Sequence, residues 1–415
     1  ETRLMTKPTL LFDARGLINI RTNGSNRGGI FFAALNVLKQ FYASDRFDIT
    51  LYCPAKEVAA LRTALESELG FAVKTVFDGV SAKKLEKLSA IELKKLKFKA
   101  EKKNLRKFLC SAYGKLFSPR KVSQTFDLYF SPQESPLPQI KAGKRFLLLH
   151  DTIPLLFESK LMRNKGWYYR VIVNMNARDG YFANSQNTKK DFLRFCPQVP
   201  PEHITVTPLA AAESFRPITD KVQLEAVREK YHLPAGKKYV FSLCSLGERK
   251  NLIRAVKTFL QFADKNKADD IVFVLGGACL VDFMKKLESE FKDLGKNADK
   301  IIRAGYVDDA DLPALYSGAQ WFVYTSQYEG FGLPPLEAMQ CGCPVITSNN
   351  SSLPEVVGDA GISIDWDSDE QHVKAYEDYY FNDNLRRSNA AKGLERAKLF
   401  SWKNTANLMM TEMLK

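Results

Sequence analysis

The sequence has few histidines and no long hydrophobic run. Its 415 residues include 4 His and 7 Cys, and no two cysteines form a Cys-x-x-Cys pair. This scatter argues against a zinc site and a disulfide framework, so we expect a reducing, cytoplasmic environment. Apolar runs such as 146–149 are far shorter than the roughly 18 residues of a membrane-spanning helix. No secretory h-region follows residues 1–6, so we expect neither a transmembrane protein nor a secreted precursor.

Positive charge is concentrated in one segment. The formal net charge is +14, and residues 83–121 hold 14 Lys or Arg and 3 Glu, an excess of +11. This segment lacks the interleaved aromatic side chains of a base-stacking platform, so we expect no nucleic-acid partner. Apolar residues such as Leu105, Phe108 and Leu116 share one face of an expected helix, which favours docking on an anionic membrane. The alternative is a helix that packs on its domain and leaves the lysines solvated.

Short apolar runs alternate with helical patterns along the chain. Strands that alternate with helices predict parallel sheets with right-handed crossovers, and twelve strands are too many for one such sheet. We therefore predict an α/β protein with two parallel-sheet domains. The expected strands are 9–12, 48–52, 128–130, 145–149, 180–183, 204–206, 239–243, 271–275, 301–304, 321–324, 344–347 and 361–364.

The domain limits follow from breaks in this pattern. We expect the first domain at 7–212, with the basic helical insertion 83–121 inside it. An irregular stretch with prolines, 208–217, leads into the second domain, expected at 213–397. The last segment, 398–415, is expected to form a helix that crosses back to the first domain.

Two glutamates mark a candidate ligand site. Glu329 and Glu337 have seven residues between them and follow an expected strand. Paired prolines indicate the first turn of a helix, which would hold Glu337 and bring both carboxylates to the carboxyl ends of the strands. Ionised carboxylates accept hydrogen bonds from vicinal hydroxyls, so the pair suits a sugar and a ribose better than a metal. Alternatively, Glu337 only complements the helix dipole and Glu329 is solvated.

From 304 to 361 the chain resembles family-four retaining glycosyltransferases, which have the GT-B fold of two Rossmann-like domains facing a cleft. The resemblance rests on the Glu-x7-Glu spacing and on the stretches Gly332-Leu333-Pro334-Pro335-Leu336-Glu337-Ala338-Met339 and Asn350-Ser351-Ser352-Leu353-Pro354-Glu355-Val356. It implies transfer of a hexose or deoxyhexose, with mannose favoured, from a nucleoside diphosphate sugar to a saccharide or lipid-linked acceptor in bacterial surface-polysaccharide synthesis. The implied chemistry needs no metal and no cofactor. The alternatives are a nucleotide-sugar epimerase or a phosphorylase of the same fold, and a basic nucleic-acid-binding protein.

The same resemblance implies roles for single residues. Arg249 and Lys250, in a turn where Gly247-Glu248 replaces the family's Glu-Pro, would neutralise the diphosphate. Glu337 would bind the ribose, Glu329 the donor sugar, and His150 the sugar and its phosphate. Asp151 is expected to cap or orient its loop. The other implied donor-binding residues are Gly28, Gly29, Tyr306, Val307, Gly330, Phe331, Gly332 and Leu333. Gly28 and Gly29 precede a helix that is expected to begin at Phe31.

Two aspartate pairs resemble metal signatures. Asp309-Ala310-Asp311 precedes Leu312-Pro313, so we expect it to cap a helix. Asp365-Trp366-Asp367 follows the last expected strand and is predicted to be a polar loop. We therefore expect no metal site.

Overall fold

A computed structural model describes most of the chain. The described residues are 6–21, 29–52, 58–76, 125–134, 140–157, 165–243, 248–277, 285–286, 289 and 297–415. Gly28 and the basic segment 83–121 lie outside them, so the expectations for those residues stay predictions. Among the described helices, none has the length and apolar character needed to cross a membrane.

The strands follow the predicted pattern closely. They are β1 Thr9–Asp13, β2 Asp48–Tyr52, β3 Lys74–Val76, β4 Phe126–Ser131, β5 Ala142–Leu149, β6 Gly180–Ala183, β7 Ile204–Val206, β8 Lys238–Leu243, β9 Ile271–Gly276, β10 Ile301–Gly305, β11 Trp321–Tyr324, β12 Val345–Ser348 and β13 Gly361–Ile364. The twelve predicted strands are confirmed to within a few residues at their ends. β3 was not predicted.

Helices occupy most of the connections between these strands. The α-helices are α1 Gly29–Ser44, α2 Val58–Leu69, α5 Ile153–Leu156, α6 Lys165–Asn174, α7 Gln186–Phe195, α8 Lys221–Lys230, α9 Leu252–Asn266, α11 Leu312–Gly318, α12 Leu333–Gln340, α13 Leu353–Val357, α14 Asp369–Phe381, α15 Asp383–Ala397 and α16 Trp402–Met413. Short 3-10 helices are η1 Ala14–Arg21, η2 Pro201–His203, η3 Glu248–Lys250 and η5 Ala298–Lys300.

The strands form two sheets with the same kind of order. The first sheet is β3-β2-β1-β4-β5-β6-β7 and the second is β10-β9-β8-β11-β12-β13. In the second sheet every neighbouring pair is parallel. Both orders reverse direction beside the first strand of the sheet, as in Rossmann-like domains. The predicted α/β fold with two parallel sheets is therefore confirmed.

The chain divides into two compact units. The first unit contains Glu1–Leu149, Met175–Phe182 and Met410–Lys415, and the second contains His150–Asn174 and Ala183–Met409. The domain limits predicted from the sequence, 7–212, 213–397 and 398–415, stay predictions.

In the first unit, aromatic side chains join the sheet to α1. Phe12 of β1 lies 5.3 Å from Phe130 of β4, and Phe41 of α1 lies 5.5 Å from Phe130, between ring centroids. All three side chains are buried. The register pairs Leu10 with Leu128 across β1 and β4, so apolar side chains stand opposite each other on neighbouring strands. The helix and the sheet therefore share one core.

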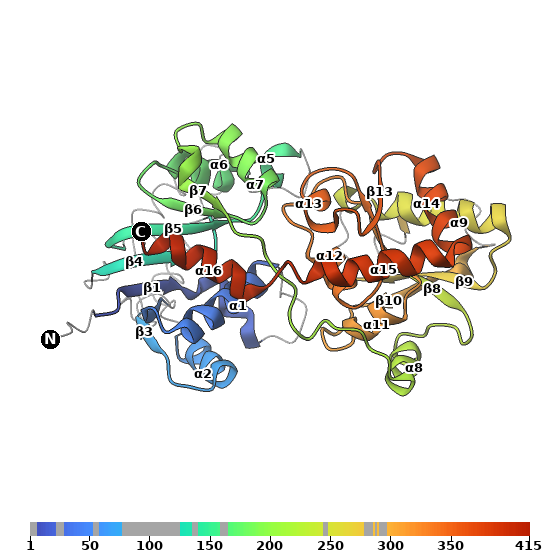
Figure 1. Ribbon diagram of the computed structural model, residues 1–415, viewed down its shortest axis with the longest axis horizontal. Coiled ribbons are helices and arrows are strands. Elements are labelled where there is room, and N and C mark those ends of the chain that lie inside the picture. Colours follow the sequence, from blue (N-terminus) through green and yellow to red (C-terminus); the bar gives the residue numbers. More distant parts are fainter. Residues whose placement is uncertain are drawn as a thin grey trace, which may run out of the picture. The chain divides into compact units, whose positions relative to one another are not determined.

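In the second unit, helices cover both faces of the sheet. Phe273 of β9 aligns with Val240 of β8 and packs 5.3 Å from Phe259 of α9. Phe241, the next residue of β8, points to the opposite face and packs 5.4 Å from Tyr316 of α11. Figure 1 shows α9 beside α14, which contacts it. Burial on both faces explains why these strands are continuous apolar runs.

Candidate active site

The candidate site of the second unit lies where the strand order of its sheet reverses. β8 and β11 are parallel neighbours at this point. The chain leaves β8 through η3 into α9, and leaves β11 through the loop 325–332 into α12. Parallel α/β sheets bind ligands at such a switch point, outside the carboxyl ends of the strands. The two loops predicted to carry the chemistry are therefore adjacent.

Glu329 forms ion pairs with both predicted phosphate-binding cations. Its Oε1 atom lies 2.6 Å from Nζ of Lys250 and 2.9 Å from Nη1 of Arg249. The Glu329 residue is only 7% exposed. Burial alone would raise the pKa of this carboxyl, but Lys250 and then Arg249 outweigh it and hold the pKa below its ordinary value. Glu329 is thus ionised and buried at neutral pH, and the interpretation as a solvated side chain is wrong.

Further polar groups fix the two cations. Nζ of Lys250 also donates to the hydroxyl of Tyr324 at 2.6 Å. The Arg249 guanidinium donates to Oγ of Ser326 at 3.3 Å and to the carbonyl of Tyr328. Both cations precede α9, whose amino terminus carries partial positive charge. Arg249, Lys250 and the helix terminus together form an anion-binding arrangement.

Asn251 explains how the turn before α9 keeps its shape. It is the N-cap residue, and its backbone is left-handed with a φ of 56°. Its Nδ2 donates to the carbonyls of Thr325, at 3.1 Å, and Trp366, at 2.6 Å. Asn tolerates this conformation better than most residues. The turn is therefore tied to the loop after β11, although Gly247 lies outside the described residues.

Glu337 has different neighbours from Glu329. It lies in the second turn of α12, because this helix begins at Leu333, so its predicted place in the first turn is wrong. The Tyr316 hydroxyl donates to its Oε2 at 3.2 Å. Burial raises the pKa of Glu337 to about 7, the Tyr316 hydrogen bond lowers it, and the negative charge of Asp309 raises it. A residue beyond the first turn gains little from the helix dipole, so that interpretation does not explain Glu337.

His150 and Gly330 meet through their backbones. A Cβ atom at Gly330 would overlap the carbonyl oxygen of His150 and would lie 2.8 Å from Cβ of Asp151. His150 is buried, and its carbonyl accepts from Nδ2 of Asn184 at 2.9 Å. The amide of Ile153 donates to Asp151 Oδ1 at 2.9 Å, so Asp151 orients the loop before α5, whose N-cap residue is Thr152. Only glycine permits this approach of the Glu329 loop to His150.

The remaining predicted residues are spread over several elements. Gly332 is the N-cap of α12 with a φ of 117°, which favours glycine, and Leu333 is the first helical residue. Phe331 and Val307 are buried, whereas Tyr306 is 41% exposed. Gly29 is the first residue of α1, two residues before the predicted helix start at Phe31. Gly29 belongs to the first unit of the chain, and the other residues named in this paragraph belong to the second.

The aspartate pairs have structural partners. Asp311 is the N-cap residue of α11, as predicted, but its side chain caps no amide. Its Oδ2 instead lies 2.5 Å from Nζ of Lys230 and accepts from the Tyr231 hydroxyl at 2.8 Å. Asp365 lies in the loop that follows β13, and its Oδ2 accepts from Nε2 of Gln371 at 2.9 Å. Within the described ranges, no three His, Cys, Asp or Glu side chains are grouped so that they could hold a metal ion.

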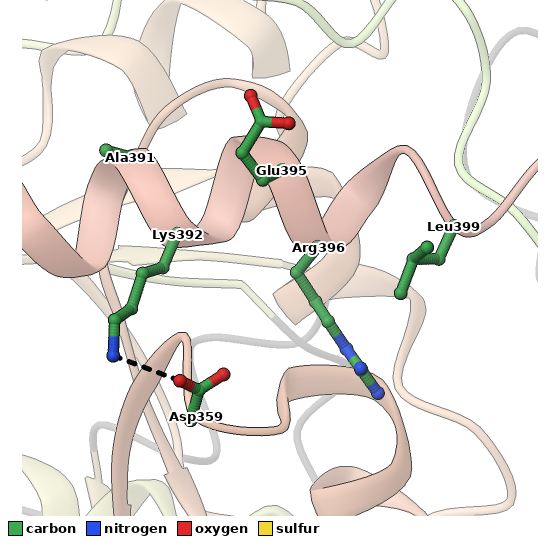
Figure 2. A pocket seen from close by; sticks show the side chains of 6 residues that line it. All are labelled: Asp359, Ala391, Lys392, Glu395, Arg396 and Leu399. Atoms are coloured by element: carbon green, nitrogen blue, oxygen red, sulfur yellow. Dashed lines mark hydrogen bonds and ion pairs between the residues drawn. The ribbon is translucent and has the colours of Figure 1, made fainter.

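A surface pocket of about 470 Å³ lies apart from these residues. Figure 2 shows its lining, in which Lys392 pairs with Asp359 at 3.0 Å. The lining residues are Asp359, Ala391, Lys392, Glu395, Arg396 and Leu399. None of them belongs to the predicted site.

Known proteins resemble parts of this chain in sequence. Residues 224–396 match the family model of glycosyl transferases group 1. The O-antigen chain mannosyltransferase B of Escherichia coli is 38% identical over 206 residues, 49% of this chain and 52% of that protein. The serotype-specific mannosyltransferase WbdA of E. coli is 29% identical over 273 residues, 64% of this chain and 32% of that protein. This chain thus spans about half, or less, of these curated relatives.

Structural comparison covers the whole chain. The crystal structure of Anabaena Alr3699/HepE in complex with UDP and glucose superposes with a TM-score of 0.66 at 18% identity, over 98% of this chain and 99% of that one. At this identity the likeness shows the fold, which is the predicted GT-B type. The family match itself is limited to residues 224–396, which lie in the second unit of the chain.

Proposed function

We propose that this chain is a retaining glycosyltransferase that moves mannose, or a similar hexose, from a nucleoside diphosphate sugar to a saccharide or lipid-linked acceptor of a cell-surface polysaccharide. The observation that carries the proposal is the cluster of Arg249, Lys250 and Glu329 at the switch point of the second sheet. Both curated relatives named above are mannosyltransferases, which supports mannose over other sugars. They also favour a transferase over an epimerase, a phosphorylase or a nucleic-acid-binding protein.

Electrostatic stabilisation of the leaving group is the central step. Negative charge grows on the diphosphate as the glycosidic bond breaks, so Arg249 and Lys250 bind the transition state more strongly than the intact donor. In the structure Glu329 pairs with both cations, and its single negative charge offsets only one of their two positive charges. The diphosphate would replace part of this ion pairing, and Glu329 would then accept hydrogen bonds from hydroxyls of the donor sugar. Glu337 would accept from the ribose hydroxyls, and His150 would contact the sugar and its phosphate.

Metal independence and retention are both part of the proposal. Two cations and a helix amino terminus supply positive charge for the diphosphate without a metal. The test is to incubate the protein with nucleoside diphosphate sugars and mannose-containing acceptors in the presence of EDTA. We expect release of the nucleoside diphosphate and a product with the anomeric configuration of the donor. Loss of turnover that magnesium or manganese restores would contradict metal independence, and an inverted product would contradict retention.

The raised pKa of Glu337 makes a prediction about binding. A carboxylate that accepts ribose hydroxyls must be ionised, and the pKa of Glu337 is about 7. Below pH 7 the Glu337 carboxyl is mostly protonated and must lose its proton before it can bind the ribose. The affinity for a nucleoside diphosphate should therefore decrease as the pH is lowered. Replacing Glu337 by Gln weakens binding at pH 8 and removes this dependence. Calorimetry should show the ratio of the two dissociation constants shrinking by up to about tenfold between pH 8 and pH 6.

The ratio of the dissociation constants of Glu337→Gln and wild type isolates the effect of Glu337, because protonation of the diphosphate itself affects both proteins equally. A ratio that stays constant across this range would contradict the ribose role of Glu337. Glu395→Gln changes an exposed glutamate of α15 and is expected to match the wild type at every pH.

Membrane docking is proposed from the sequence alone, because 83–121 lies outside the described residues. Its excess of +11 attracts anionic lipid by about 1 kcal/mol for each nearby basic residue. We expect flotation with anionic vesicles at low salt and weaker flotation at high salt. Five replacements by Gln should abolish it, at Lys94, Lys95, Lys97, Lys102 and Lys103. As a control with the same change in charge, five replacements by Gln outside the segment should leave flotation unchanged, at Lys374, Lys392, Lys398, Lys403 and Lys415. A wild type that stays unbound at low salt would refute docking.

A further inference from the structure

The amino-terminal part of α7 holds one residue next to Glu329. The hydroxyl of Ser185 donates to the carbonyl of Gly330 at 2.7 Å, and the hydroxyl of Thr188 donates to the same carbonyl at 3.0 Å. Ser185, Thr188 and this carbonyl are buried, so these bonds are shielded from water. The position of Gly330 is therefore set by α7.

The same helix holds the residue on the other side of Glu329. The Tyr328 hydroxyl donates to Oδ2 of Asp191 at 2.6 Å, and Nδ2 of Asn187 donates to the Tyr328 hydroxyl at 2.8 Å. We call Ser185, Asn187, Thr188 and Asp191 the α7 clamp. Since the clamp holds both neighbours of Glu329, it fixes the backbone that carries the carboxylate.

Glu355 of α13 fixes the clamp in turn. Its Oε2 accepts from the amide of Gln186 and its Oε1 from the amide of Asn187, both at 2.7 Å. A helix leaves its first amides without partners inside the helix, and a negative charge there also interacts favourably with the helix dipole. Ser185 satisfies the next amide, that of Thr188, at 3.0 Å. The carboxylate of Glu355 thus completes the cap of α7.

Arg396 of α15 binds the backbone of Glu355 and of the next residue. Its Nη2 donates to the carbonyl of Glu355 at 2.7 Å, and its Nε donates to the carbonyl of Val356 at 3.1 Å. Figure 2 shows Arg396 extending from α15 beside the pocket. A residue engaged through both its backbone and its carboxylate has little freedom to move.

We propose that Glu355 is a positioning residue that acts through the α7 clamp to hold Glu329 against Lys250 and Arg249. This role rests on the proposed glycosyltransferase function. Glu355 itself contacts neither cation; the connection runs from its carboxylate to the first turn of α7, and from the clamp to Tyr328 and Gly330. Loss of the cap releases the loop, and the Glu329 carboxylate leaves the geometry that the reaction needs. A misplacement of about 1 Å at a reacting group can cost about 100-fold in rate.

The first test separates turnover from nucleotide binding. In Glu355→Ala we expect kcat for the nucleotide sugar to fall by about 10- to 100-fold. The nucleoside diphosphate should bind at least as tightly as to wild type, because the cations and Glu337 remain and a displaced Glu329 competes less for the cations. Glu355→Gln keeps one acceptor and should retain intermediate turnover. Tyr328→Phe removes only the hydroxyl that binds the clamp and should also lower kcat without weakening nucleotide binding.

Two matched controls distinguish positioning from general destabilisation. Asp359→Asn removes an exposed carboxylate that pairs with Lys392. Tyr380→Phe removes a hydroxyl that donates to Asp270 at 2.6 Å, at the amino end of β9. Both should leave kcat within about twofold of wild type. The proposal fails if kcat of Glu355→Gln and of Tyr328→Phe also stays within twofold of wild type. It fails equally if the two control variants lose as much kcat as Glu355→Gln and Tyr328→Phe.

Amide hydrogen exchange tests the clamp without turnover. In Glu355→Ala, or in Glu355→Gln if the first variant does not fold, we expect faster exchange at Gln186 and Asn187 and also at Glu329, whose amide donates to Ser351 at 3.0 Å. The amide of Gln371, capped by Ser368, should not change. Faster exchange at Gln186 and Asn187 without faster exchange at Glu329 would contradict the proposal, because Glu355 would then only cap α7. If wild type turns over no nucleotide sugar, the proposed function fails. Hydrogen exchange at Glu329 would still show whether the α7 clamp holds the loop that carries this residue.

Discussion

Replacing Glu329 by Gln is expected to lower turnover by about 100-fold or more while nucleoside diphosphate binds more tightly. The two effects have opposite signs because Glu329 has two roles. Its carboxylate, 2.6 Å from Lys250, competes with the diphosphate for the cations, so its loss frees them. The same carboxylate accepts hydrogen bonds from the donor sugar, and a neutral amide replaces a charged acceptor by a weaker one.

Calorimetry and steady-state kinetics on one preparation measure both effects. Asp369→Asn is the matched control, because Asp369 also bridges an arginine and a lysine, at 2.9 Å from Arg254 and 3.1 Å from Lys257, but is more exposed. We expect this variant to keep wild-type turnover and affinity. Turnover of Glu329→Gln within about twofold of wild type would remove Glu329 from the site.

The second large effect is expected from Gly330→Ala. The added Cβ would overlap the His150 carbonyl oxygen and lie 2.8 Å from Cβ of Asp151. Because backbone atoms cannot turn aside as a flexible side chain can, the loop must shift. We expect a loss of about 2 kcal/mol or more in the free energy of unfolding. Turnover should fall by about 100-fold, because Glu329 moves with the loop.

A second glycine separates close packing from backbone strain. Gly236 has a φ of 73° and no atom within 4 Å of its would-be Cβ. Gly236→Ala should therefore cost only about 1 kcal/mol, from its left-handed backbone, and should keep full turnover. Denaturant unfolding gives both free energies. If both variants lose the same free energy of unfolding and both keep full turnover, the close approach of Gly330 to His150 is not needed for function.

The sequence predicted the sheets well because their strands are buried on both faces. Runs such as Ile271–Gly276 are continuously apolar and bounded by polar residues, a local signal that needs no knowledge of partners. β3 was missed because Lys74-Thr75-Val76 is short and lies at the edge of its sheet, where a strand needs fewer apolar residues. The first helix was expected at Phe31 instead of Gly29, since boundaries depend on cap geometry.

The candidate site was predictable as a set of residues but not as a network. The family resemblance singled out Arg249, Lys250 and Glu329, yet nothing local indicates that the three are ion-paired. The roles of Tyr324 and Asn251 were missed for the same reason, although Asn251 directly follows the basic pair. Such contacts join positions more than 70 residues apart, and only the completed fold brings them together.

The most direct measurement is the rate at which wild type and Lys250→Ala release nucleoside diphosphate from a nucleotide sugar, with saccharide acceptor and EDTA present. Lys250 is the cation nearest Glu329, and its charge should matter most as the bond to the diphosphate breaks. We expect wild type to turn over, with a mannose donor preferred, and Lys250→Ala to be slower by about 100-fold with its fold intact. Equal rates in the two proteins, or no release from any nucleotide sugar by wild type, would contradict glycosyl transfer at this site.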